Sequence, residues 1–301
     1  MTTMTPPTAA DPTATISPAP PALPAGVVDE RLVPIPHRVV EVRRDTADTV
    51  TIALAPLRGD IAPFEPGQVS MLYAFGTGEV PISVSSSPAQ TDRLEYTIRR
   101  VGAVTKALTN VEPGEYVGVR GPFGVPWPVE QARGRDVVVL AGGIGLAPLR
   151  AAMLHLLGHR HAYGQVSLLY GARTAGDILY RDELETWRSR LDTDIDVTVD
   201  AAGSGWHGNV GLVTRLVPRA RFDEQRAVAF VCGPEVMMRY GAQALVERGM
   251  APEDVYLSAE RNMLCGIGTC GHCQLGPYFL CHHGPVLSWS ELSPYLRVRE
   301  L

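Results

Sequence analysis

The sequence predicts an all-β barrel or sandwich, followed by a doubly wound α/β domain and a short C-terminal metal-binding segment. Three observations carry this prediction. Short β-branched runs fill residues 34–121, strands alternate with helices over residues 136–248, and four of the five cysteines lie in the last 37 residues. The 301 residues suit about two domains of ~150 residues each. With 45% hydrophobic and 20% charged residues, the composition is that of a globular protein.

The N-terminal half contains the β-branched runs. They alternate apolar with polar positions and are separated by turn residues, which is typical of a small antiparallel barrel or sandwich. The predicted strands are residues 39–42, 49–54, 69–74, 94–99 and 116–120. We therefore expect an all-β domain over residues 31–130.

From residue 131 the pattern changes to strands that alternate with helices, which indicates a doubly wound parallel sheet. The run DVVVLA at residues 136–141 is a continuous apolar strand, as expected for a strand buried on both faces. The predicted strands are residues 136–141, 166–170, 195–199 and 227–232, and the predicted helices are residues 146–157, 178–191 and 235–248. The α/β domain is expected over residues 131–260.

The two ends of the chain differ from these domains. Residues 261–301 have almost no periodicity and are dominated by cysteine, glycine and histidine, so we expect something other than a hydrophobic core to hold this segment. Residues 1–30 contain seven prolines and no lysine or arginine. That composition predicts a disordered or polyproline-like tail and not a signal peptide.

Charge, hydropathy and cysteine usage exclude several classes of protein. The formal net charge of −5 provides no basic field, so nucleic acid is not an expected partner. No stretch reaches the ~18 uninterrupted apolar residues of a membrane span. An odd, crowded set of cysteines argues against a disulfide framework and predicts a cytoplasmic protein. Because only Lys106 among the 27 basic residues is a lysine, a single arginine is a weak indicator of a phosphate site.

A glycine-rich turn follows the first strand of the α/β domain. Gly142, Gly143 and Gly145 come between that strand and a predicted helix. Glycines at such a turn let the backbone approach a pyrophosphate whose charge lies at the helix N-terminus. We predict nucleotide binding here, and the alternative is a tight turn with a purely steric purpose. The spacing is not G-x-G-x-x-G, so a plain dehydrogenase is not the first interpretation.

Two further motifs lie at strand ends. Cys232, Gly233 and Pro234 end the last α/β strand, where open sheets bind ligands, and the alternative is that Cys232 is a small buried apolar residue. In the β domain, Gly102 and Thr105 stand where a strand passes into a helical stretch. They could offer N–H groups and a hydroxyl to a second phosphate, or serve only as turn residues.

The cysteine segment gives the most specific signal. Cys265, Cys270, Cys273 and Cys281 have the spacing C-x4-C-x2-C-x7-C, with glycines between them. This spacing matches plant-type [2Fe–2S] ligation, in which a glycine-rich loop directs N–H groups at sulfur. Structural zinc usually takes two C-x2-C pairs, and only one is present. We predict an iron–sulfur cluster, with zinc or disulfides as the alternatives.

Residues from about 34 to 301 resemble the ferredoxin–NADP reductase superfamily, in the branch with a C-terminal [2Fe–2S] segment. The segment SAERNMLCGIGTCGHCQ at residues 258–274 carries the resemblance, together with the two turns described above. It is most similar to the gamma subunits of cytoplasmic NAD(P)-linked [NiFe] hydrogenases, or sulfhydrogenases. The electron-transfer subunit of dihydroorotate dehydrogenase B and the B subunit of anaerobic sulfite reductase are similar relatives.

The resemblance implies that the barrel binds FAD. The residues it places at the flavin are Pro81, Ile82 and Ser83 beside the isoalloxazine and Gly102, Val104 and Thr105 at the pyrophosphate. The superfamily's R-x-Y-S signature departs here to Val80-Pro81-Ile82-Ser83, without the arginine or the aromatic ring. We therefore expect Arg100 to supply charge at the flavin phosphates.

The resemblance also implies that the α/β domain binds NAD(P)H. It places Gly142, Gly143 and Gly145 at the phosphates, Cys232 as the catalytic residue near the nicotinamide, and Gly233 and Pro234 beside it. No acidic residue follows the strand at 166–170 to bond a ribose 2′-hydroxyl. Arg173 or Arg181 could meet a 2′-phosphate instead, so we favour NADP over NAD.

These cofactors imply an electron-transfer subunit. NAD(P)H delivers two electrons as a hydride, an iron–sulfur centre accepts one at a time, and flavin can do both. We predict a diaphorase subunit that forms a complex with the iron–sulfur and catalytic subunits of a hydrogenase. The alternatives are the dihydroorotate dehydrogenase or sulfite reductase system and, from another class, a zinc-stabilised adaptor without catalytic activity.

Overall fold

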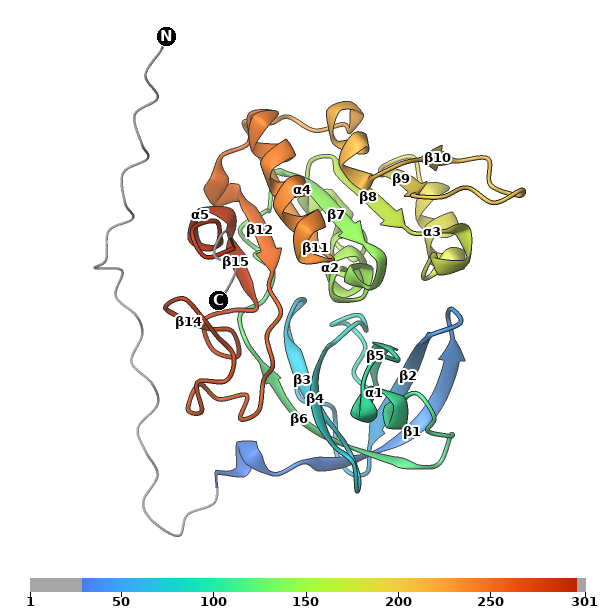
Figure 1. Cartoon of the computed structure of the whole chain (residues 1–301), viewed down its shortest axis with the longest axis vertical. Helices are drawn as coiled ribbons and strands as arrows, with labels where there is room; N and C mark the ends of the chain where they lie inside the picture. The colour runs from blue at the N-terminus through green and yellow to red at the C-terminus, as the bar shows by residue number, and fades with distance from the viewer. Residues whose placement is uncertain (1–28, 297–301) are drawn as a thin grey trace.

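The computed structural model describes residues 29–296, and nearly all of the predicted tail over residues 1–30 lies outside that range. The β domain and the α/β domain lie one against the other, and the cysteine segment runs along both (Figure 1). Among residues 29–296, no helix has the length and apolar character to cross a membrane.

The N-terminal domain is a six-stranded antiparallel sheet in the order β4-β3-β6-β1-β2-β5. The end strands β4 and β5 approach each other without forming a ladder, so the sheet curls into an open barrel. Alternate apolar residues, among them Ile52, Leu54 and Ile98, fill its inside. The elements are β1 (Ile35–Arg44), β2 (Thr49–Pro56), β3 (Val69–Ala74), β4 (Gly78–Ser83), β5 (Leu94–Arg99), α1 (Ala103–Leu108) and β6 (Tyr116–Phe123).

The second domain is a seven-stranded sheet in the order β10-β9-β8-β7-β11-β12-β15, parallel except for β15. On β7, Val137 and Val139 face one core and Val138 and Leu140 face another, so helices cover both faces. The strands are β7 (Asp136–Gly142), β8 (Val166–Ala172), β9 (Asp194–Val199), β10 (Asn209–Val210), β11 (Ala227–Cys232) and β12 (Val255–Ser258). The main helices are α2 (Leu146–Gly158), α3 (Arg181–Arg188) and α4 (Glu235–Glu247).

The predicted fold class is confirmed, with one helix shorter than expected. The helix predicted over residues 178–191 is α3, Arg181–Arg188. Ile178 and Leu179 precede the helix and are buried in the core. Tyr180 has a left-handed φ of 50°, so the helix cannot begin before Arg181.

The cysteine segment is held partly by a hydrophobic core, so the expectation that its core is not hydrophobic is wrong. It contains β13 (Gln274–Leu275), β14 (Tyr278–Phe279), β15 (Val286–Ser288) and α5 (Trp289–Leu292). β15 pairs with β12 at the edge of the large sheet. Leu275, Leu280 and Leu287 are at most 5% exposed in the core beside α4. The domain boundaries at residues 130 and 260 stay a prediction.

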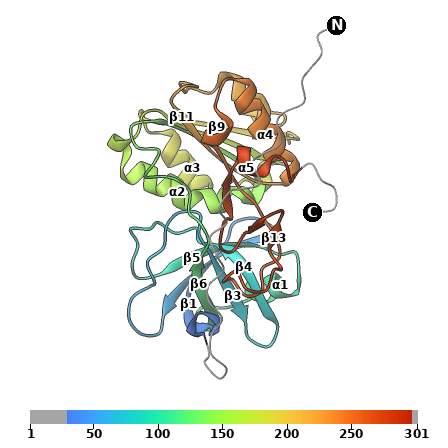
Figure 2. The same ribbon diagram turned by 90° about the vertical axis from the view of Figure 1, so that its left-hand side faces the viewer.

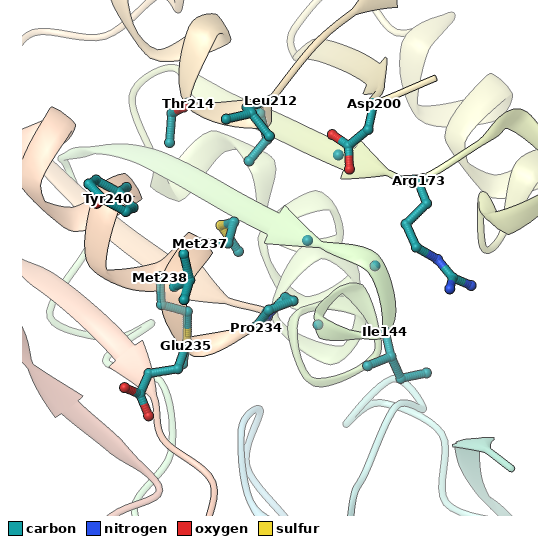
Figure 3. A pocket seen from close by; sticks show the side chains of 18 of the residues that line it. Ile144, Arg173, Asp200, Leu212, Thr214, Pro234, Glu235, Met237, Met238 and Tyr240 are labelled. Carbon is teal, nitrogen blue, oxygen red and sulfur yellow. The ribbon is translucent and has the colours of Figure 1, made fainter. Parts of the chain in front are cut away.

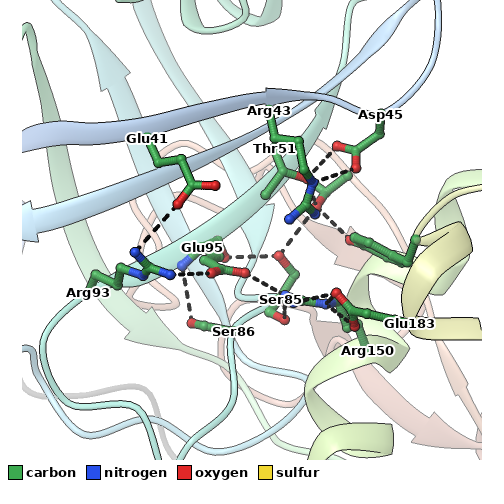
Figure 4. A network of polar contacts seen from close by, with 12 residues as sticks. Glu41, Arg43, Asp45, Thr51, Ser85, Ser86, Arg93, Glu95, Arg150 and Glu183 are labelled. Atoms are coloured by element: carbon green, nitrogen blue, oxygen red, sulfur yellow. Dashed lines mark hydrogen bonds and ion pairs between the residues drawn. The ribbon is translucent and has the colours of Figure 1, made fainter. Parts of the chain in front are cut away.

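A buried network of polar side chains joins the two domains (Figure 4). Arg150 of α2 donates to Glu183 of α3 and, across the domain contact, to Glu95 of β5 at 2.6 Å and to the Ser85 carbonyl at 2.8 Å. Its guanidinium also lies over the Tyr180 ring, 5.0 Å from the centroid. Because the Arg150 side chain is only 9% exposed, its charge depends on these partners.

Replacing Arg150 with methionine should destabilise the protein. The change removes one member of a buried ion network, leaves Glu183 without its cation and leaves Glu95 with only Arg93, 3.6 Å away. Loss of one partner from such a network typically costs about 3–5 kcal/mol. Urea denaturation would measure the change in the free energy of unfolding. Arg133→Met is the matched control, because Arg133 and Glu130 form an exposed pair, and its unfolding curve should stay close to that of the unmodified protein. Equal curves for both variants would contradict the role assigned to Arg150.

Candidate functional site

A cavity of about 960 Å³ opens at the carboxyl ends of β7, β8 and β11, where open α/β sheets bind ligands (Figure 3). The turn from β7 to α2 and the turn from β11 to α4 both line it, and Thr49 and Arg99 of the β domain close one side. Gly142, Gly143, Gly145, Arg173, Gly233 and Pro234, all predicted from the sequence, line this cavity.

The glycine turn packs directly against the second turn. A Cβ on Gly145 would lie 2.3 Å from the Cys232 carbonyl oxygen, and a Cβ on Gly142 would lie 2.8 Å from Cε of Met237. Gly143 has a φ of 54°, which L side chains rarely adopt. The glycines therefore bring two strand ends together beneath the cavity and leave the N-terminus of α2 open to it.

Arg173 and Asp200 lie together at one end of the cavity (Figure 3). Arg173 is 63% exposed and pairs with Asp177 at 2.8 Å. Arg181 instead donates to the Ala175 carbonyl. The sequence analysis missed Asp200, which directly follows β9, because it considered only the strand at 166–170 as a source of acidic residues.

Cys232 lies beneath the cavity and is 1% exposed. Burial, together with the nearby Glu260 carboxylate, raises the pKa of its thiol well above the ordinary value, so the thiol is neutral. Glu260 itself lines the cavity and is accessible from it. Desolvation at the cavity wall raises the pKa of its carboxyl above the ordinary value. Sequence reasoning missed Glu260, although it follows the end of β12 by two residues.

The structure brings the predicted flavin residues together, but two of them already have partners. β4, with Pro81, Ile82 and Ser83, contacts α1, which Gly102 precedes and which contains Val104. The Thr105 hydroxyl accepts from the N–H groups of Val101 and Gly102. Arg100 donates to Thr109 and Asn110 at the far end of α1. Phosphate contacts by Thr105 and Arg100 would require these hydrogen bonds to change, and they stay predictions.

The cysteine loop directs backbone donors at sulfur. The N–H of Ile267 donates to Sγ of Cys265 at 3.4 Å, and the N–H of Gly268 to Sγ of Cys281 at 3.1 Å. The contact between Cys273 and Cys281, whose sulfurs lie 3.3 Å apart, lowers the pKa of Cys273 to about 6 and raises the pKa of Cys281 above its ordinary value, so the two sulfurs share one proton. Burial raises the pKa of Cys265, but the Thr269 hydroxyl and the Ile267 N–H outweigh it and lower this pKa to about 6.

These features suit a thiolate-bound cluster. Thiolates are the ligands that iron takes, and N–H donors stabilise the charge on cluster sulfur. Cys270 is exposed, and within residues 29–296 no three potential ligands converge as they do around a single ion. Gly266 and Gly268, with φ of 77° and 78°, give the loop its tight path.

Two known domain families match this chain, one over the α/β domain and one over the cysteine segment. The oxidoreductase NAD-binding domain matches residues 139–243, and the iron-sulfur cluster binding domain of dihydroorotate dehydrogenase B matches residues 260–293. Sulfhydrogenase 2 subunit gamma of Pyrococcus furiosus is 34% identical over 276 residues, which cover 85% of this chain and 95% of the relative. A probable dihydroorotate dehydrogenase B (NAD(+)) electron transfer subunit of the same organism is 34% identical, covering 76% of this chain and 81% of the relative.

This chain belongs to the family of sulfhydrogenase gamma subunits and dihydroorotate dehydrogenase B electron-transfer subunits. The predicted resemblance is confirmed. Membership makes the chain an NAD(P)H-dependent oxidoreductase of the electron-transfer type, with an iron–sulfur binding domain at its C-terminus.

Solved structures agree on the fold. An NADH-dependent reduced ferredoxin-NADP oxidoreductase, described in work on flavin-based electron bifurcation, superimposes with a TM-score of 0.67 at 24% identity, covering 88% of this chain and 94% of the other. A ferredoxin NADP+ reductase from Neisseria gonorrhoeae, solved with bound FAD and NADP, gives 0.64 at 20% identity, covering 74% and 96%. This chain therefore has the ferredoxin reductase fold.

Replacing Glu260 with glutamine should change how stability depends on pH. The folded pKa lies above the ordinary value of 4.5, so the folded state binds the proton more tightly than the unfolded state. The stability of the unmodified protein then falls as pH rises from the unfolded to the folded pKa. Glu260→Gln should be more stable than the unmodified protein at neutral pH, and this gain should vanish below pH 4.5.

Urea denaturation at a series of pH values would test this. Glu185→Gln, at an exposed position on α3, is the control and should follow the unmodified protein throughout. A Glu260→Gln profile parallel to that of the unmodified protein would show that burial does not perturb this carboxyl.

Proposed function

We propose that the protein passes electrons between NAD(P)H, FAD and a [2Fe–2S] cluster as a subunit of a [NiFe] hydrogenase complex. One observation carries this proposal. Ile267, Cys273 and Cys281 of the cysteine loop share a hydrophobic core with Met71 and Phe123 on β3 and β6. The ribbon of the cysteine segment accordingly runs beside β3 and β4 (Figure 2). β3 is also the partner of β4, which carries the proposed flavin residues. The cysteine loop therefore packs on the sheet that would hold the flavin.

The cavity would hold the nucleotide. Gly142, Gly143 and Gly145 leave the N-terminus of α2 free to receive its phosphates, and Arg173 could meet a 2′-phosphate. Cys232 and Glu260, close enough for the carboxylate to raise the pKa of the thiol, would lie at the nicotinamide end. The neutral thiol of Cys232 shapes the floor on which the ring would rest, and hydride transfer needs no strong acid or base from the protein.

Flavin, when bound, would exchange two electrons with NAD(P)H as a hydride and release them singly to the cluster. The residues of β4 would hold its ring between the cavity and the cysteine loop. Gly102 and Val104 would lie beside its phosphates, with Thr105 and Arg100 available after their present hydrogen bonds exchange.

The four cysteines suit a two-iron cluster better than zinc. A structural zinc ion needs four ligands that converge on one point. In a [2Fe–2S] cluster each iron takes two protein ligands, so close pairs of thiolates suffice. The spacing C-x4-C-x2-C-x7-C, with only one C-x2-C pair, supports this interpretation over structural zinc.

The relatives are named as subunits, so we propose that the chain acts within a cytoplasmic complex. Its hydrogenase partners would be an iron–sulfur subunit and the catalytic subunit. The similarity to dihydroorotate dehydrogenase B subunits favours that enzyme as the second candidate.

Anaerobic purification tests the proposal. The protein should be brown, with flavin and iron–sulfur absorption, and should contain iron and acid-labile sulfide. NAD(P)H should bleach the flavin and support reduction of an artificial acceptor. A colourless protein with stoichiometric zinc would instead establish the adaptor alternative. Co-purification with hydrogenase or with dihydroorotate dehydrogenase subunits would separate the two complexes.

Cys232→Ala should slow hydride transfer while flavin and cluster stay bound. The substitution removes the sulfur atom beneath the nicotinamide position without touching the flavin strand or the cysteine loop. Stopped-flow measurement of flavin reduction by NAD(P)H should show a rate slower by on the order of tenfold, because the nicotinamide would be held less accurately against the flavin. An unchanged rate would return Cys232 to a packing role.

A further inference from the structure

Arg120 is a buried arginine that joins the β domain to the cysteine loop. It lies on β6, and its side chain is only 3% exposed. Its guanidinium donates to both carboxylate oxygens of Glu79 at 2.7 and 2.6 Å. It also donates to the carbonyls of Leu264 at 3.0 Å and Cys265 at 2.8 Å. The arginine of this bidentate ion pair thus also binds the backbone of Cys265, a predicted cluster ligand.

The partner carboxylate lies on the proposed flavin strand. Glu79 is in β4, two residues before Pro81. Met71 of β3 is the register partner of both Pro81 and Arg120, so the pair spans three adjacent strands. One ion pair therefore contacts the strand proposed to hold the flavin and the loop proposed to hold the cluster.

The loop is packed tightly at this contact. The Arg120 guanidinium lies over the Phe123 ring, 5.6 Å from its centroid. A Cβ on Gly266 would lie 2.9 Å from Cε2 of the same ring. Arg120 and Phe123 thus fix the backbone on both sides of Cys265.

We propose that Arg120 and Glu79 are a positioning pair that seats the cluster loop and, by cancelling each other's charge, keeps the reduction potential of the centre bound there from shifting. This inference rests on the proposed function. A buried charge acts on a neighbouring redox group across a low dielectric, so it is weakly screened. With both members present their charges largely cancel. Removing either leaves the other uncompensated, and the two removals act in opposite directions.

The test compares Arg120→Met, Glu79→Gln and Arg120→Lys in the anaerobic holoprotein. The midpoint potential of the cluster is read by a redox titration monitored by electron paramagnetic resonance, with iron and sulfide content measured in parallel. Arg120→Met leaves the Glu79 carboxylate, which disfavours an added electron, and should lower the potential. Glu79→Gln leaves the arginine cation and should raise it. Each shift should reach about threefold in the equilibrium constant, or about 30 mV at 59 mV per tenfold change.

Arg120→Lys keeps the positive charge but loses the planar guanidinium that makes the bidentate hydrogen bonds. Its potential should stay close to that of the unmodified protein, with a shift well below that of Arg120→Met. Iron should be lost faster to a chelator because the Leu264 and Cys265 carbonyls lose their donors. Arg135→Met is the matched control. Arg135 donates to Asp254 and to the Arg226 and Ala227 carbonyls in a similar arrangement, at the amino ends of β7, β11 and β12, opposite the end that carries the cavity. Its potential should not move.

Shifts of the same sign for Arg120→Met and Glu79→Gln, or shifts no larger than that of Arg135→Met, would overturn the inference. If Arg120→Met fails to assemble a cluster, the sign for Glu79→Gln and the charge rescue in Arg120→Lys decide the outcome. An unmodified protein that reacts with NAD(P)H through its flavin but holds no iron would overturn both the inference and the proposed cluster. A protein with a reducible cluster and unshifted variants would overturn the inference alone.

Discussion

A buried guanidinium must be neutralised and hydrogen-bonded on every side, and two such groups hold this molecule together. Arg150 takes its partners from α3 and from the far domain, through Glu95 and the Ser85 carbonyl. Arg120 takes its partners from β4 and from the cysteine loop. Each arginine is satisfied only when separate parts of the chain reach their final positions. The relative placement of nucleotide cavity, flavin strand and cysteine loop depends on both.

The regular elements could be predicted wherever one periodicity dominates. The strand expected over residues 227–232 is β11, because six consecutive small or apolar residues face a core on either side. β4 was not predicted as a strand, since all its residues are half-buried and it contains Pro81, so neither alternation nor a continuous apolar run marks it. The apolar residues of the cysteine segment, such as Leu280 and Leu287, are irregularly spaced, and their shared core becomes visible only in three dimensions.

The parts of the site that are formed by contiguous sequence motifs could be predicted. The glycine turn and the cysteine spacing are contiguous signals, and the turn lies at the cavity. Asp200 and Glu260 follow strand ends and could have been found by inspecting every carboxyl end of the sheet. The hydrogen-bond partners of Arg100 and Thr105 could not have been predicted. Local hydrogen bonds at the two ends of α1 compete with contacts to a ligand, and residue spacing does not show which of the two forms.

The antiparallel strand β15 bears on how the chain avoids sticking to copies of itself. An uncovered strand edge is a template for aggregation. β12 is protected on that side by β15, which lies only five residues beyond Cys281 and close to the end of the described chain. The β12 edge therefore stays open until residues 286–288, which follow the cysteine loop in the chain, have paired with it. Protection of this sheet against edge-to-edge aggregation thus depends on the cysteine segment, which carries β15.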